Sequence, residues 1–205
     1  YYIEDTMQYP VYQKNKAWDD ASASVEYLKN VMTSFGMEGR WAYRDIASGE
    51  CYGMSLQKVN EICSTADVFI NISCSTFMRD EYASVSKRIL IDSDPMFTQM
   101  QYYKEREGEL KTSTKELILS HNYLFSFGEN IGTDDCKIPT FNFTWLATRQ
   151  PVCLELWDKK NGQNKYGFSS IMNWSGRQKL NYNNEEWGQK DVEFMKFIDV
   201  PAGIP

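Results

Sequence analysis

The segment KRILIDSDPMFTQ, residues 87–99, constrains the fold more than any other part of the chain. Its apolar run, residues 89–91, ends abruptly at Asp92, Asp94 and Pro95, and a helical pattern follows. A buried strand that delivers carboxylates to its carboxyl end, directly before a helix, is how open α/β sheets place ligand-binding groups. The segment therefore predicts an α/β sheet with a ligand site at the carboxyl edge of its strands.

The same alternation of strand, polar turn and helix recurs along the chain. Further strands are predicted at 41–44 (or an extended loop), 67–73, 123–127, 143–148 and 167–174. Helices are predicted at 25–35, 55–63, 80–84, 95–107, 114–120 and 189–198. In the second of these, Ser55 is the expected N-cap, and Leu56, Val59, Ile62 and Cys63 are expected to face inward. This alternation favours a Rossmann-like α/β fold with a mostly parallel sheet and flanking helices. The strands that close at Asp92, Gly128 and Trp174 are expected to run in one direction and open into a shared crevice.

The polar run DKKNGQNK, which begins at Asp158, carries a turn signal. It predicts a linker over 158–166. The chain would then consist of an N-terminal Rossmann-like domain, 1–157, and the beginning of a C-terminal Rossmann-like domain, 167–205.

Composition excludes several classes of protein. The net charge of −6 and the pI of about 5.0 argue against a nucleic-acid binder, because phosphate contacts need clustered Lys and Arg. The five cysteines are odd in number and form no C-x-x-C pair, which suits reduced cytoplasmic thiols. No apolar run approaches the roughly 20 residues of a membrane span. No signal peptide is recognised, so a cytoplasmic protein without a transmembrane segment is expected.

Three interpretations compete for Asp92-Ser93-Asp94. A haloacid-dehalogenase-type phosphatase uses D-x-D for nucleophile and acid, although Pro95 and Met96 depart from its pattern. A metal-dependent GT-A-type transferase uses D-x-D to hold Mg²⁺ or Mn²⁺ against a nucleotide diphosphate. In the third interpretation, one of the two carboxylates caps a helix that has Pro95 in its first turn.

Two further groups of residues follow later strands. Glu129 and Asn130 lie between glycines in the turn 128–132, which would let the backbone approach a ligand, or would simply make a tight turn. Arg149 can pair with a phosphate or a substrate carboxylate, or form an internal salt bridge with Asp92 or Glu129.

The only histidine, His121, precedes the strand predicted at 123–127. It would lie at the amino edge of the sheet, on the wrong side for the proposed site. A solvated or capping role is therefore favoured over that of a catalytic base.

The motifs LIDSDPMFTQ, FGENIG, IPTFNFTWLATRQPV and SIMNW occur in this order. Together they resemble a group of bacterial proteins described as glycosyltransferase-like, which are similar in layout to GT-B enzymes with two Rossmann-like domains. The resemblance covers roughly residues 1–200. It implies that the chain begins at the end of the second strand of the N-terminal domain, so that the first β-α unit is absent. It also implies that 167–174 is the first strand of the C-terminal domain.

The resemblance implies transfer of a sugar from a nucleotide-sugar donor to an acceptor by an incomplete enzyme. It implies no cofactor and no catalytic metal ion, and the nucleotide sugar is the co-substrate. A non-catalytic relic of the fold that binds carbohydrate or a partner is the alternative. The catalytic candidates are Asp94 and Glu129. The candidates for substrate contacts are Asp92, Asn130, Arg149, Asn173 and Trp174.

Overall fold

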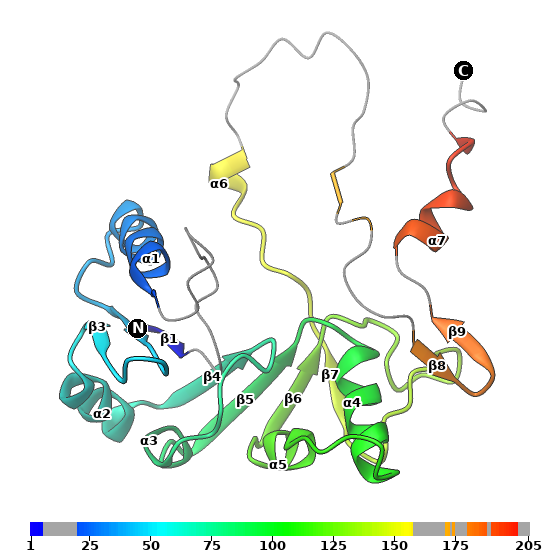
Figure 1. The fold of residues 1–205 in the computed structure, drawn as a ribbon, viewed down its shortest axis with the longest axis horizontal. Coiled ribbons are helices and arrows are strands. Elements are labelled where there is room, and N and C mark those ends of the chain that lie inside the picture. The colour runs from blue at the N-terminus through cyan, green and yellow to red at the C-terminus, as the bar shows by residue number, and fades with distance from the viewer. Residues whose placement is uncertain (6–19, 158–170, 173, 175–179, 188–189, 201–205) are drawn as a thin grey trace, which may run out of the picture. The chain divides into compact units, whose positions relative to one another are not determined.

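A computed structural model describes residues 1–5, 20–157, 171–172, 174, 180–187 and 190–200 (Figure 1). The chain divides into two compact units, Tyr1–Gln150 and Pro151–Pro205. Within the described residues, the larger unit carries two sheets and the smaller one carries a two-stranded sheet.

The first sheet of the larger unit has the strand order β1, β2, β3. Its strands and helices are β1 (Tyr2–Asp5), α1 (Ser22–Ser34), β2 (Trp41–Arg44), β3 (Cys51–Gly53) and α2 (Leu56–Thr65). β1 pairs with β2 in parallel, and β2 pairs with β3 antiparallel. Residues 41–44 are predicted as a strand or an extended loop, and the structure has the strand. The sequence does not predict β3, whose three residues carry no alternating pattern.

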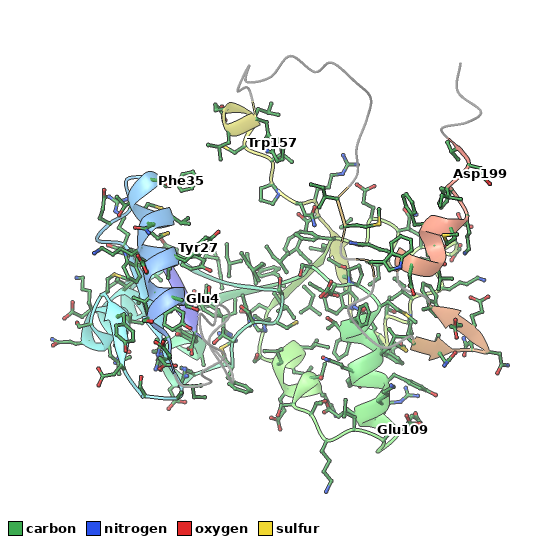
Figure 2. All side chains as sticks on the ribbon, turned by 45° about the horizontal axis from the view of Figure 1, so that its top comes forward. Glu4, Tyr27, Phe35, Glu109, Trp157 and Asp199 are labelled. Atoms are coloured by element: carbon green, nitrogen blue, oxygen red, sulfur yellow. The ribbon has the colours of Figure 1, made fainter. Side chains whose placement is uncertain are left out.

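The predicted first helix is confirmed as α1. Its Met32 is buried against Trp41 and Tyr43 of β2. Tyr27 and Phe35 remain exposed (Figure 2). The helix is thus amphipathic and covers one side of the first sheet.

The predicted second helix is confirmed as α2, and it begins at its expected cap. The Ser55 hydroxyl accepts a hydrogen bond from the backbone N–H of Lys58 at 3.2 Å. Val59 and Cys63 are buried as expected. Leu56, predicted to face inward, is exposed, because it occupies the first helical turn ahead of the part of α2 that reaches the core.

The second sheet contains four strands, all parallel, in the order β4, β5, β6, β7 (Figure 1). Its strands are β4 (Val68–Ile72), β5 (Lys87–Asp92), β6 (Tyr123–Ser126) and β7 (Trp145–Ala147). The intervening helices are α3 (Asp80–Ala83), α4 (Phe97–Arg106) and α5 (Thr114–Leu119). The molecule is therefore an α/β protein with a parallel sheet and flanking helices, compatible with a Rossmann-like fold.

The two faces of the second sheet differ. Leu90, Leu124 and Trp145 are buried on one face, where they pack with Ile118 of α5. The opposite face carries exposed apolar side chains, namely Val68, Ile70, Ile72, Tyr123 and Leu146. Right-handed crossovers between strands in sequential order place their helices on one face, which explains the asymmetry.

The smaller unit contains α6 (Leu154–Trp157), β8 (Leu180–Tyr182), β9 (Glu185–Trp187) and α7 (Lys190–Met195). β8 and β9 form an antiparallel hairpin whose turn residues, Asn183 and Asn184, both have positive φ. The helix predicted at 189–198 is present as α7. The strand predicted at 167–174 and the linker at 158–166 lie largely outside the described residues. Ile171, Met172 and Trp174 are described, and none of the three is in a strand.

No helix among the described residues has both the length and the apolar character needed to cross a lipid bilayer.

Candidate functional site

The carboxyl ends of β5, β6 and β7 lie at one edge of the second sheet. Asp92 is the register partner of Ser126, which is in turn the partner of Ala147. The turns that follow are tied together, since Phe127 N–H donates to the Asp92 carbonyl at 3.0 Å and Thr148 N–H donates to the Ser126 carbonyl at 2.9 Å. The predicted common direction of the strands ending at Asp92 and before Gly128 is confirmed. Trp174 belongs to the other unit, so the third member of the predicted crevice stays a prediction.

Asp92 is the best-bonded side chain at this edge, and it is only 1% exposed. Its Oδ1 accepts from the Asp94 N–H at 3.1 Å and from the Thr98 hydroxyl at 2.8 Å. Its Oδ2 accepts from the Gln99 amide at 3.1 Å. Burial raises the pKa of Asp92 above its ordinary value, and these hydrogen bonds act in the opposite direction. Asp92 therefore organises the turn into α4, and its contact with a substrate stays a prediction.

The start of α4 differs from the prediction. The helix begins at Phe97, so Pro95 precedes it and does not lie in its first turn. Met96 occupies the N-cap position in place of the predicted Asp92 or Asp94, and has a φ of 78°. The Met96 N–H donates to the side-chain carbonyl of Gln99 at 2.7 Å. The added turn separates Asp92 from the helix backbone, so its carboxylate reaches side chains of the first turn instead.

The glycine turn after β6 packs against the aspartate turn. Gly128 N–H donates to the Ser126 hydroxyl at 3.1 Å. A Cβ at Gly128 would lie 3.2 Å from the Cβ of Pro95, a tight approach that only glycine makes without displacement. Of the two roles considered for this turn, the tight turn is present, since Ile131 N–H donates to the Gly128 carbonyl at 3.0 Å. The approach of its backbone to a ligand stays a prediction. Asn130 is exposed, and its carbonyl accepts from Thr133 N–H at 3.0 Å.

The internal salt bridge predicted for Arg149 is confirmed, with Glu129 as its partner. Both side chains are largely exposed, at 82% for Arg149 and 52% for Glu129. Exposed ion pairs contribute about 0–1 kcal/mol to stability, so this pair can open to admit a charged ligand. Asp94, also exposed, lies on the neighbouring turn.

The remaining two candidates, Asn173 and Trp174, belong to the smaller unit, which is described by itself. Asn173 lies outside the described residues. Trp174 packs edge-on against Phe194 of α7, with ring centroids 5.9 Å apart, and its carbonyl accepts from the Asp191 N–H at 3.1 Å. Its predicted position across a cleft stays a prediction.

The donor set of Asp92 bears on the metal-dependent alternative. Its Oδ1 accepts two hydrogen bonds and its Oδ2 accepts one, so only Oδ2 keeps a lone pair for a cation, and the side chain is buried. Within the part of the chain that is described, no three or more His, Cys, Asp or Glu side chains gather closely enough to hold a metal ion.

His121 has one of the two roles predicted for it. Its Nδ1 lies 2.7 Å from the carbonyl of Leu117, so it caps the carboxyl end of α5. It is buried, so the solvated alternative is wrong. Burial also lowers the pKa of His121 below its ordinary value.

The sequence does not predict a buried charged cluster at the end of β1. Asp5 accepts two hydrogen bonds from the Arg79 guanidinium, at 2.6 and 2.9 Å, and one from the Tyr82 hydroxyl at 2.9 Å. Arg44 lies 3.8 Å from Asp5 and pairs with Glu81. Burial raises the pKa of Tyr82, so this hydroxyl remains a hydrogen-bond donor. Arg79 and Tyr82 lie more than 70 residues from Asp5 in the sequence, and no local pattern joins them.

The structure also contains a cavity that the sequence does not predict. It has a volume of about 560 Å³ and lies between β1 and β4. Ser73 lines it, and its hydroxyl lies 2.5 Å from that of Ser93 in the aspartate turn. The cavity therefore borders the candidate site at the carboxyl end of β4.

No family model, no curated protein and no solved structure matches this chain. The function must therefore be argued from the residues themselves.

Proposed function

We propose that this chain is part of a GT-B-type glycosyltransferase, which transfers a sugar from a nucleotide-sugar donor to an acceptor. It would comprise the N-terminal domain without its first β-α unit and the start of the C-terminal domain. One observation carries the proposal: the parallel second sheet brings Asp94, Glu129 and Arg149 to the same edge. Ligands of open α/β sheets bind at the carboxyl ends of the strands.

The side chains at this edge can take distinct roles. Glycosyl transfer needs a base or an ordered acceptor hydroxyl, and positive groups that stabilise the leaving diphosphate. Asp94 and Glu129 are both exposed candidates for the base, and the Glu129 carboxylate is bound by Arg149. Arg149 would exchange Glu129 for the diphosphate or for a charged acceptor. The metal-free form of the reaction is supported by the hydrogen bonds that already occupy Asp92.

The test is release of nucleoside diphosphate from a panel of UDP-, GDP-, ADP- and dTDP-linked sugars, with and without EDTA. We expect slow hydrolysis of at least one donor, unaffected by EDTA. Asp94→Asn should reduce the rate about 100-fold or more, as for loss of a general base. Asp67→Asn is the matched control, because Asp67 is an exposed aspartate directly before the amino end of β4. Equal rates for both variants would refute the role of Asp94.

The non-catalytic relic is the second candidate, and the Arg149–Glu129 pair favours it. In a relic, charges that once faced a ligand neutralise each other. A relic would hydrolyse no donor, and its melting temperature would shift with no nucleotide in the panel. Hydrolysis of any donor would exclude the relic.

A further inference from the structure

A fourth strand end reaches the edge of the sheet that carries the candidate site. β4 and β5 lie side by side (Figure 1), and Ile72, the last residue of β4, is the register partner of Ile91 in β5. The pairing continues one residue further, because the Ser73 N–H donates to the Ile91 carbonyl at 2.8 Å. Ser73 therefore lies beside Asp92, and the turn after β4 adjoins the aspartate turn, residues 92–96.

Two side-chain contacts tie the turn after β4 to the aspartate turn. The hydroxyls of Ser73 and Ser93 lie 2.5 Å apart. The Thr98 side chain hydrogen-bonds the Cys74 thiol, and its hydroxyl also donates to Asp92 Oδ1 at 2.8 Å. The same threonine thus orders Asp92 and the turn that carries Ser73.

The backbone of these two turns has a conformation that few side chains adopt. Among the described residues, four that are neither glycine nor asparagine have positive φ: Ser73 at 62°, Cys74 at 55°, Met96 at 78° and Phe141 at 51°. Three of these four lie at the carboxyl ends of β4 and β5. The left-handed conformation is unfavourable for such side chains, and strained residues of this kind concentrate at binding and catalytic sites. The backbone therefore marks the β4 end of this edge as a candidate for ligand binding.

The two serine hydroxyls suit a ligand that both donates and accepts hydrogen bonds. Ser73 is exposed and Ser93 is half-buried. One hydroxyl of the pair donates to the other, so the second keeps its proton for an outside acceptor, and both oxygens keep lone pairs. A sugar hydroxyl donates and accepts in the same way. A phosphate oxygen at neutral pH mainly accepts, and the exposed carboxylate of Asp94, directly after Ser93, would repel it.

Positive charge lies at the other end of this edge. Arg149 follows β7, which is three strands along from β4 in the second sheet. Neighbouring strands are about 4.8 Å apart, so the ends of β4 and β7 are separated by about 14 Å. A donor whose diphosphate is bound by Arg149 would therefore leave the serine pair to a second molecule, the acceptor.

We propose that the hydroxyls of Ser73 and Ser93 bind the acceptor, and that this acceptor is a neutral carbohydrate. One sugar hydroxyl would hydrogen-bond to the serine pair, and a neighbouring hydroxyl would then face Asp94. The inference rests on the proposed function, because it takes the second ligand of this edge to be the acceptor of sugar transfer.

The probes are the methyl α-glycosides of glucose, mannose, galactose and N-acetylglucosamine. We expect at least one of them, without nucleotide, to cause saturable amide chemical-shift changes in the turns 73–75 and 92–95. The 6-phosphate of the glycoside that binds best should bind about fivefold more weakly, because its charge is repelled by Asp94. No saturable shift with any glycoside, or shifts that spare these two turns, would overturn the proposal. Equal or tighter binding of the phosphate would overturn the assignment of a neutral acceptor.

Serine variants test the location. Ser73→Ala and Ser93→Ala should each weaken glycoside binding about tenfold, as for the loss of one hydrogen bond. Ser64→Ala is the matched control, because Ser64 is exposed in α2 and its hydroxyl donates to the Glu61 carbonyl of its own helix at 2.8 Å. Binding by both folded variants that equals binding by the control would overturn the proposal. If one variant does not fold, the other decides, and if neither folds, the position of the shifts decides.

Failure of this inference is distinguishable from failure of the proposed function. Donor hydrolysis together with unchanged glycoside binding by Ser73→Ala and Ser93→Ala would overturn the serine site and leave sugar transfer in place. Glycoside binding that depends on both serines, without hydrolysis of any donor, would support the serine site and refute sugar transfer. The chain would then be the non-catalytic relic that binds carbohydrate.

Discussion

The hydrogen bonds of Asp92 make a quantitative prediction for Asp92→Asn. Oδ1 accepts two hydrogen bonds and Oδ2 accepts one, so the amide oxygen of the variant should take the place of Oδ1. Its NH₂ group then faces the NH₂ group of Gln99. Gln99 cannot turn over without loss, because its carbonyl accepts from the Met96 N–H at 2.7 Å. Two buried donors therefore oppose each other.

A buried donor left without an acceptor costs about 1–3 kcal/mol. Removal of the carboxylate charge recovers part of this cost, since burial raises the pKa of Asp92. We expect Asp92→Asn to lower the free energy of unfolding by about 2 kcal/mol. Gln99→Glu alone should cost at least as much, because it places two carboxylates together in a buried site.

The double variant Asp92→Asn/Gln99→Glu should recover stability, because the new carboxylate accepts from both the amide at 92 and the Met96 N–H. A coupling free energy of about 1–2 kcal/mol is expected from the double-mutant cycle. Urea unfolding at pH 7, followed by far-UV circular dichroism, measures all four proteins. If Asp92→Asn is as stable as the unsubstituted chain, or the two substitutions are additive, the assigned hydrogen bonds are wrong.

Three other predictions follow from the contacts around the sheets. Arg79→Ala should lower the free energy of unfolding in urea by about 3–5 kcal/mol, because Asp5 loses its bidentate partner. Arg79→Lys should cost less, and equal losses for the two variants would contradict the bidentate geometry. His121 has a folded-state pKa below its ordinary value of 6.5, so the free energy of unfolding should be constant above pH 6.5 and fall as the pH drops below it. His121→Gln should therefore reduce the change of the urea midpoint with pH between about pH 5.5 and 7.5. An unchanged pH dependence in this variant would argue against the burial of His121. Arg149→Ala should change the free energy of unfolding by less than about 1 kcal/mol, since the pair with Glu129 is exposed; a larger loss would show that the pair is structural.

The sequence predicts those parts of the fold that have local patterns. The apolar runs of β4 and β5 and the Ser55 cap of α2 are readable because each signal lies within a few residues. β3 and the β8–β9 hairpin are not predicted, because their three-residue strands are too short to show a period.

The candidate site is predicted less well than the strands that carry it. The sequence places Asp92 at a strand end because an apolar run directly precedes it. The alternation of helices and strands predicts that the strands are parallel. The burial of Asp92 cannot be predicted in this way, because it depends on the positive φ of Met96 and on the hydrogen bonds from Thr98 and Gln99. The cavity between β1 and β4 is set by contacts between distant segments, for which one sequence holds no local signal.

The most direct test of the proposed sugar transfer is an amide chemical-shift titration of the chain with UDP-, GDP-, ADP- and dTDP-linked sugars. We predict that at least one donor causes saturable shifts confined to the turns at 93–96, 128–131 and 148–150, with Asp94 and Arg149 among the most affected. Shifts that map elsewhere in the larger unit, or none with any donor, would contradict the assignment of a ligand site to the carboxyl ends of β5, β6 and β7.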